Sequence, residues 1–314
     1  MFPSFLPYEV NLLQENNSIA LAKSIKRAQI RTPLSQNAIA PARTQGFATA
    51  YVCQGTGTPI LLLHGFDSSV LEFRALFPLL AKSNQTWAVD LLGFGFTQRL
   101  LEIDYNPSTI KTHLYAFWQT LINRPVMLVG ASMGGATAID FTFSYSHAVE
   151  KLVLINSVGF SGDFPLGKLL FPPLDYLAIE YWRQRKLQAL FLGSKFGNLK
   201  PGEIEAIRCA VLHLEMSNWQ AAMISFTKSG GYGDLVEKIA QINTQTLILW
   251  GQLDETLPKI DAEKFKSTIA HSRLVWLDCG HVPHLERSQI VANQLQLFNN
   301  SGVKNLLGGQ IQVF

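Results

Sequence analysis

The stretch from Val126 to Gly135 constrains the fold of this chain of 314 residues more than any other. Residues 126–129 form an apolar run that is too short for a helix and is closed by Gly130, as expected of a buried parallel strand. Residues 136–141 can begin a helix directly behind it. Between the two lies a Gly-x-Ser-x-Gly pattern, whose small residues allow a strained turn and leave the Ser132 hydroxyl exposed. The stretch therefore predicts a nucleophile on a sharp strand-to-helix turn.

The pattern by itself is weak support for catalysis. With glycine and serine each near 7% of residues, it arises by chance about 0.1 times in a chain of this length. A glycine-rich strand-to-helix loop with an incidental serine is the alternative explanation, so the remaining sequence must decide.

Further short apolar runs and helical patterns alternate along the chain. We predict strands at 59–63, 87–90, 149–156, 246–251 and 273–277. Helices are predicted at 69–82, 108–122, from about Lys259, and at 288–298, and the first is expected to start with a Ser69–Glu72 capping box. This alternation indicates βαβ units. The predicted fold class is α/β, with a mostly parallel central sheet flanked by helices.

The alternation is interrupted between about Ser157 and Ile242, where aromatic residues and helical patterns dominate. We interpret residues 157–242 as a mainly helical cap inserted into a core of residues 46–156 and 243–300. Residues 301–314 are expected to form a C-terminal tail.

The first 45 residues have a different character. A helix is predicted from Asn17 or Ser18 to about Ile30, with basic residues between its apolar ones. We expect this segment to pack on the core, while peripheral membrane contact through it remains an alternative. Residues 48–54 alternate enough to be an edge strand.

Composition excludes several classes of function. Hydrophobic residues make up 47% of the chain and charged residues 16%, which is typical of a globular protein. A net charge of +3 and the lack of a dense basic block argue against nucleic acid. Cys53, Cys209 and Cys279 lack metal-ligand spacing, so we expect no metal and a reducing compartment. Without a signal peptide or a transmembrane segment, the expected location is cytoplasmic.

A serine nucleophile needs a base, and the base needs an orienting carboxylate. In parallel sheets, functional groups gather at the carboxyl ends of strands. Two predicted strands after the insertion end in suitable residues. One run leads from Trp250 to Asp254, and the other leads from Leu277 to His281.

With these motifs, the chain resembles the α/β-hydrolase fold superfamily of lid-bearing serine hydrolases, over about residues 58–298. The turn around Ser132, the acid Asp254 in Trp-Gly-x-x-Asp and His281 in the last loop match in the order Ser, Asp, His. The resemblance implies that Asp254 orients His281, which takes the proton of Ser132. Asp278 is the rival acid and His284 the rival base.

The resemblance also implies an oxyanion hole, made by the backbone N–H groups of Phe66 and Met133. His64 is expected to brace that loop. Asp67 either faces the pocket or helps to start the following helix, and we favour the second role. The loop that begins at Asp90 is interpreted as scaffold.

In the enzymes that this chain resembles, an insertion at the position of residues 157–242 forms a lid over the active site. The aromatic residues of such a lid would favour an apolar substrate. The basic residues Arg183, Arg185 and Lys186 are interpreted as a solvated helix face. The function expected is hydrolysis of an ester, or a related acyl bond, of a largely apolar small molecule, without a cofactor. Carbon–carbon bond hydrolysis and cofactor-free perhydrolysis use the same triad, and a ligand-binding member with low turnover is a further alternative. The sequence carries no indication of oligomeric state.

Overall fold

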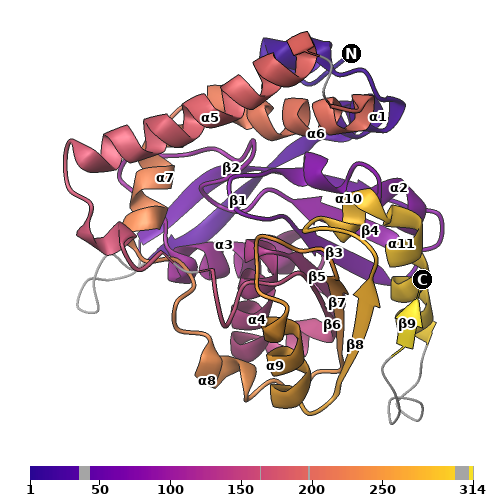
Figure 1. The fold of residues 1–314 in the computed structure, drawn as a ribbon. Coiled ribbons are helices and arrows are strands. Elements are labelled where there is room, and N and C mark those ends of the chain that lie inside the picture. Colours follow the sequence, from indigo (N-terminus) through magenta and orange to yellow (C-terminus); the bar gives the residue numbers. More distant parts are fainter. Residues whose placement is uncertain (35–42, 163, 197–198, 301–310, 314) are drawn as a thin grey trace.

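The computed structural model describes residues 1–34, 43–162, 164–196, 199–300 and 311–313 (Figure 1). Its centre is one sheet in which, within this described part, nine strands follow the order β1-β2-β4-β3-β5-β6-β7-β8-β9. The strands are β1 (Lys26–Leu34), β2 (Arg43–Gln54), β3 (Pro59–Leu63), β4 (Gln85–Val89), β5 (Val126–Ala131), β6 (Val149–Ile155), β7 (Thr246–Gly251), β8 (Ser272–Leu277) and β9 (Ile311–Val313).

From β4 through β3 to β9 in the sheet order, neighbouring strands pair in parallel. The pairs β1–β2 and β2–β4 are antiparallel. Every residue of β3, β5 and β7 is buried, as expected where helices cover both faces of a parallel sheet. The predicted α/β fold class is confirmed. Because β5 lies between β3 and β6, the turn after β5 is at the centre of the carboxyl edge.

Helices form a layer on each face of the sheet (Figure 1). Side chains of α3 (Pro107–Leu121), α4 (Met133–Ser144) and α9 (Ile260–Thr268) pack in one hydrophobic cluster. Those of α1 (Asn16–Ser24), α2 (Phe77–Leu80) and α11 (Ser288–Asn300) pack in the other, on the opposite face. The two clusters alternate along each strand, since successive side chains point to opposite faces.

The described part of the chain between β6 and β7 forms helices. Most of them lie over one end of the sheet, whereas the last one lies beside α4 (Figure 1). The elements of this segment are η4 (Gly167–Leu169), α5 (Leu174–Phe196), α6 (Pro201–Val211), η5 (Leu212–Glu215), α7 (Trp219–Lys228) and α8 (Val236–Ile239). We call the segment from residue 157 to residue 242 the cap.

Two predictions for the N-terminal part are wrong. The predicted helix ends at Ser24 rather than near Ile30, and Lys26–Leu34 is strand β1. Residues 48–54 belong to β2, which is not an edge strand because it lies between β1 and β4. The physical reason is pairing: β1 forms a long antiparallel ladder with β2, and this tertiary contact outweighs the local helical pattern.

The single helix predicted at 69–82 is also wrong, since the chain forms a short 3₁₀ turn η2 (Val70–Phe73) and then α2. Ser69 Oγ accepts from the N–H of Leu71, but the Glu72 carboxylate accepts from the N–H of Gly65 at 3.0 Å. No capping box therefore forms. Pro78, in the first turn of α2, lacks the N–H that a continuous helix needs.

The C-terminal end adds a strand that was not predicted. Of the predicted tail 301–314, residues 301–310 and 314 lie outside the described residues, and 311–313 form β9 beside β8. Among the described helices, none is both long and apolar enough to cross a membrane.

Candidate active site

Ser132 occupies a strained turn between β5 and α4. Its φ of 51° lies in the left-handed region, which non-glycine residues rarely adopt. Backbone hydrogen bonds hold it there. Its N–H donates to the Ile155 carbonyl at 3.0 Å, and its own carbonyl accepts from Gly135 at 2.9 Å and Val158 at 3.1 Å. The surrounding structure therefore imposes the conformation that exposes the hydroxyl.

Close packing explains the glycines around this serine. A Cβ atom on Gly130 would overlap with the carbonyl of Gly134, and one on Gly134 would overlap with the carbonyl of Leu63. A Cβ on Gly135 would overlap with the Ser157 side chain. The Gly-x-Ser-x-Gly-Gly pattern is thus required by the approach of α4 to the sheet, in addition to any catalytic use.

Three side chains from three strand ends form a continuous chain of contacts. His281, after β8, places Nε2 3.1 Å from the Oγ of Ser132. Its Nδ1 lies 2.9 Å from Oδ2 and 3.1 Å from Oδ1 of Asp254, which follows β7. With an ionised Asp254, Nδ1 donates to the carboxylate and Nε2 presents its lone pair to the serine hydroxyl.

The Asp254 carboxylate is buried and well supplied with donors. Besides His281, the N–H groups of Thr256 and Leu257 donate to Oδ1 at 2.7 and 3.1 Å. Burial alone would raise the pKa of Asp254, but the hydrogen bond and charge interaction with His281 and these two N–H groups outweigh burial. The pKa of Asp254 lies below its usual value, so the group is ionised at neutral pH.

The two rival residues lie elsewhere. The Asp278 side chain is 65% exposed and lies 3.8 Å from the guanidinium of Arg287. His284 is buried, and its Nε2 lies 3.0 Å from Oε1 of Glu72. The residues that meet at Ser132 are therefore the ones favoured from the sequence.

The predicted oxyanion donors flank Ser132. Neither the N–H of Phe66 nor that of Met133 donates to an acceptor among the described residues. A Cβ on Gly65 would lie 3.4 Å from the Cβ of Ser132, which places the loop containing Phe66 directly against the serine. Both N–H groups are thus available to an incoming group at this position.

The loop before Phe66 is braced from the core, as predicted for His64. The Nδ1 of His64 donates to the Gly65 carbonyl at 2.8 Å, and its Nε2 accepts from the N–H of Leu91 at 3.1 Å. Asp90 accepts from the N–H groups of Val70 and Phe96, both at 2.6 Å, which supports its interpretation as scaffold.

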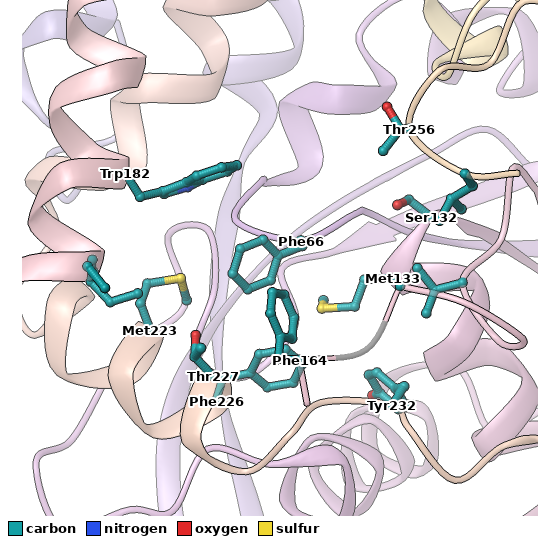
Figure 2. Close-up of a pocket in the computed structure, with 15 residues that line it drawn as sticks. Phe66, Ser132, Met133, Phe164, Trp182, Met223, Phe226, Thr227, Tyr232 and Thr256 are labelled. Atoms are coloured by element: carbon teal, nitrogen blue, oxygen red, sulfur yellow. The ribbon is translucent and has the colours of Figure 1, made fainter. Parts of the chain in front are cut away.

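A cavity of about 340 Å³ lies between the cap and the core and reaches Ser132 (Figure 2). Its lining includes side chains of α5 and α7 on the cap side and the loops after β3, β5 and β7 on the core side. None of the lining residues is charged; they are Phe66, Ser132, Met133, Val158, Gly162, Phe164, Ala178, Ile179, Trp182, Met223, Phe226, Thr227, Tyr232, Thr256 and Leu257.

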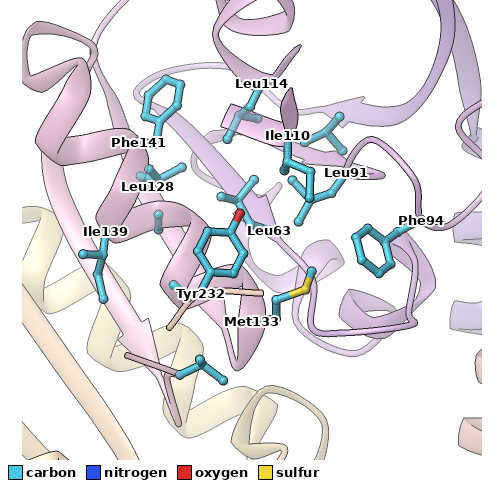
Figure 3. Close-up of a cluster of buried hydrophobic side chains, with 14 of the residues drawn as sticks. Leu63, Leu91, Phe94, Ile110, Leu114, Leu128, Met133, Ile139, Phe141 and Tyr232 are labelled. Carbon is cyan, nitrogen blue, oxygen red and sulfur yellow. The ribbon is translucent and has the colours of Figure 1, made fainter. Parts of the chain in front are cut away.

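Seven of these residues also belong to the buried core cluster, among them Met133 and Tyr232. Figure 3 shows Met133 and Tyr232 among the buried side chains of α3, α4 and the sheet. The floor of the cavity is therefore continuous with the tightly packed interior, which restricts its shape.

Residues 58–288 match the family described as alpha/beta hydrolase fold. The chain belongs to the α/β-hydrolase family. It is 32% identical over 300 residues to the alpha/beta hydrolase domain-containing protein VTE7 of Arabidopsis thaliana, covering 95% of this chain and 90% of that protein. It is 29% identical to a 2-hydroxy-6-oxo-2,4-heptadienoate hydrolase of Pseudomonas putida, and the alignment covers 75% of this chain and 86% of that protein.

Among solved structures, a thermophilic esterase from Thermogutta terrifontis matches with a TM-score of 0.70. The alignment covers 87% of this chain and 98% of the esterase, at 23% sequence identity. At this identity the likeness shows the α/β-hydrolase fold alone.

One residue of this α/β hydrolase that sequence reasoning missed is Asn156, at the end of β6. It has a φ of 40°, and its Nδ2 donates to Asp254 at 2.5 Å. Its Oδ1 accepts from the N–H of Gly251 at 3.0 Å, so it ties the acid to the neighbouring strand. A polar residue that closes an apolar strand was the available signal.

Asp67 and Lys186 contradict their predicted roles. Asp67 does not start a helix; it is 1% exposed and bonded to side chains of the cap. Lys186 is not on a solvated face, because its Nζ lies 2.6 Å from the Asp67 carboxylate. The predictions failed because the partners are far apart in sequence.

Among the described residues, no group of three or more His, Cys, Asp or Glu side chains could hold a metal ion.

Proposed function

We propose that this α/β hydrolase is a serine hydrolase that cleaves an ester of a largely apolar small molecule through an acyl-enzyme intermediate. The observation that carries the proposal is the position of His281, whose two ring nitrogens contact Ser132 and Asp254. A serine hydroxyl is a weak nucleophile unless a base in this position removes its proton.

The reaction follows from this geometry. Ser132 Oγ attacks the ester carbonyl carbon as its proton passes to Nε2 of His281, and Asp254 stabilises the resulting imidazolium. The N–H groups of Phe66 and Met133 stabilise the oxyanion of the tetrahedral intermediate. His281 then gives the proton to the departing alkoxide, and the C–O bond breaks. A water molecule, deprotonated by His281, hydrolyses the acyl-enzyme and restores Ser132.

The cavity supports a neutral, apolar substrate. Because none of its lining residues is charged, a carboxylate or ammonium group entering it would lose hydration without gaining an ionic partner. Aromatic and aliphatic walls instead favour an apolar acyl or alcohol group. Most of the lining is contributed by the cap, so we propose that the cap selects the substrate.

Carbon–carbon bond hydrolysis is a second candidate because two similar proteins carry such names. These are the 2-hydroxy-6-oxo-2,4-heptadienoate hydrolase and a 2-hydroxymuconate semialdehyde hydrolase that is 28% identical to this chain. The substrate named for the first is a carboxylate. An uncharged cavity is a poor match for that anion, so ester hydrolysis is the better supported activity.

A panel of substrates distinguishes the two. We expect kcat/KM for p-nitrophenyl esters to rise with acyl length from acetate upward, by about fourfold per methylene that is buried, which corresponds to about 0.8 kcal/mol. The heptadienoate should be hydrolysed at least about tenfold less efficiently than the best ester. Ser132→Ala serves as the control for uncatalysed hydrolysis. A flat response to acyl length, or a preference for the dienoate, would contradict the proposed substrate class.

We also propose that the protein is cytoplasmic and that its N-terminal segment packs on the core. Cys53, Cys209 and Cys279 are free thiols, which supports a reducing, cytoplasmic compartment. Apolar side chains of the first 25 residues, including Leu6, Val10 and Leu21, are buried in the core cluster. This burial supports packing on the core rather than peripheral contact with a membrane.

A further inference from the structure

A single carboxylate joins the cap to the loop that carries Phe66. Asp67 follows Phe66 directly, is 1% exposed and has a φ of 47°. All four side-chain donors to its carboxylate come from the cap. Oδ1 accepts from Nε2 of His213 at 2.8 Å and Nε1 of Trp219 at 2.8 Å, whereas Oδ2 accepts from Nε1 of Trp182 at 2.9 Å and Nζ of Lys186 at 2.6 Å.

These donors keep Asp67 ionised although it is buried. Burial would raise the pKa of Asp67, but the charge of Lys186 and the bonds from Lys186 and His213 hold it below its usual range. His213 is itself fully buried, and burial lowers its pKa to about 4. The histidine is therefore a neutral donor at neutral pH, and Lys186 is the cation that balances the carboxylate.

The backbone of this loop is held from both sides. On the cap side, Nζ of Lys186 also donates to the carbonyl oxygen of Asp67 at 2.7 Å. On the core side, Glu72 accepts from the N–H of Gly65 at 3.0 Å. Phe66 lies between these two anchors, and Figure 2 shows its ring between Trp182 of the cap and Ser132. The two anchors therefore restrain the backbone on either side of Phe66, through the N–H of Gly65 and the carbonyl oxygen of Asp67.

From this we propose that Asp67 is a positioning residue through which the seated cap holds the Phe66 N–H in place for the oxyanion. The inference rests on the proposed serine hydrolase function. It adds that the oxyanion site of this protein is complete when the cap is in contact with Asp67. A small displacement of the Phe66 N–H weakens a bond that matters most in the transition state.

The charge balance gives the inference a second consequence. Without Lys186, Asp67 would keep its negative charge next to Phe66, whose N–H is the proposed donor to the oxyanion. The donors left to the carboxylate would all be neutral. Lys186→Met should therefore lower kcat, and adding Asp67→Asn should remove the unbalanced charge. The double variant is expected to be at least as active as Lys186→Met, so the two effects are not additive.

The first test measures kcat and KM for a p-nitrophenyl ester, with active sites counted by stoichiometric fluorophosphonate labelling. Asp67→Asn should lower kcat per labelled site by about tenfold to a hundredfold, with KM changed less than about threefold. The matched control is Asp175→Asn, which removes a buried carboxylate paired with Lys228 within the cap at 3.1 Å. Its kcat per site should stay within about threefold of wild type.

Counting active sites separates positioning from folding. If Asp67 were merely structural, Asp67→Asn would reduce the number of labelled sites and leave kcat per site unchanged, which would overturn the inference. Lys186→Met, whose side chain is partly exposed, provides a second variant with the same expected direction if Asp67→Asn folds poorly. Its kcat per site should fall as well, and an unchanged value would count against the inference.

Hydrogen exchange gives a readout that does not depend on activity. Amides of residues 64–70 and of α5 should exchange faster in Asp67→Asn than in Asp175→Asn, since the link between loop and cap is lost. Equal exchange in the two variants would refute the link. A wild-type protein that neither hydrolyses esters nor labels at Ser132 refutes the proposed function. An active wild type with unaffected Asp67→Asn refutes the role of Asp67 alone.

Discussion

His281 and His284 lie three residues apart after β8, the first in a loop and the second in helix α10 (Pro283–Glu286), and their surroundings differ. The His281 side chain is 22% exposed and bridges Ser132 and Asp254. His284 is 1% exposed and packs between Glu72 and the ring of Phe73, with ring centroids 5.3 Å apart. At the scale of single residues, the contact with Ser132 is why we propose His281, and not His284, as the base.

Substituting each histidine by glutamine tests this assignment. His281→Gln should lower kcat by about 10⁴-fold or more, since loss of the base removes the action of the whole triad. His284→Gln should keep kcat per labelled site within about tenfold of wild type. Its cost should appear instead in urea denaturation, as about 1–3 kcal/mol of unfolding free energy. Comparable loss of kcat in both variants would show that the base is wrongly assigned.

The residues that could be predicted from the sequence are those with a local pattern. Ser132, Asp254 and His281 each follow an apolar strand with a glycine nearby, so the three motifs together can be recognised from the sequence. Asp67 has no such pattern, because its partners Trp182 and Trp219 lie 115 and 152 residues away. A carboxylate whose donors are this distant is indistinguishable in sequence from one that begins a helix.

At the scale of elements, helix α3 is tied to β1 and β2 by a buried histidine. His113 Nδ1 lies 2.6 Å from Oγ1 of Thr32, and its Nε2 lies 3.0 Å from Oγ1 of Thr49. Thr49 Oγ1 also donates to the Phe47 carbonyl, so it accepts from Nε2–H. Burial lowers the pKa of His113 to about 3, and the imidazole is neutral in the folded protein.

The depressed pKa of His113 predicts acid sensitivity. Between pH 6.5 and about 3 the unfolded chain binds a proton at His113 that the folded protein does not, so the unfolding free energy falls as pH falls. The slope from this group is at most about 1.4 kcal/mol per pH unit. From pH 7 to pH 5.5, His113→Gln should lose about 1 kcal/mol less than wild type in urea denaturation. The exposed His271→Gln should lose as much as wild type, and equal losses in all three proteins would contradict the account.

Element prediction succeeded where one segment carries its own signal. Buried strands such as β5 and β7, and the amphipathic helix α3, are confirmed within a residue or two of their predicted bounds. It failed for β1 and for the helix predicted at 69–82. In the first case pairing with β2 decides the structure, and in the second the Glu72 carboxylate accepts a hydrogen bond from Gly65 and does not cap a helix. Both predictions failed because a tertiary contact overrides a local preference.

At the scale of the whole molecule, the proposed function depends on two parts of the chain meeting at one cavity. The core supplies Ser132 and its partners at the carboxyl edge of the sheet, and the cap supplies most of the apolar wall. The sequence predicted an insertion rich in aromatic residues. It could not predict that the walls are uncharged, because they combine residues from Phe66 to Leu257 and include none of the basic residues of α5.

Peptide mass spectrometry after incubation with a fluorophosphonate tests the nucleophile most directly. Because the proposed mechanism has His281 activate the one hydroxyl that it contacts, wild type should carry one adduct, on Ser132. Ser132→Ala should carry none, while Ser144→Ala, which changes an exposed serine of α4, should label like wild type. No adduct in wild type, or an adduct that persists in Ser132→Ala, would contradict the assignment of Ser132 as the nucleophile.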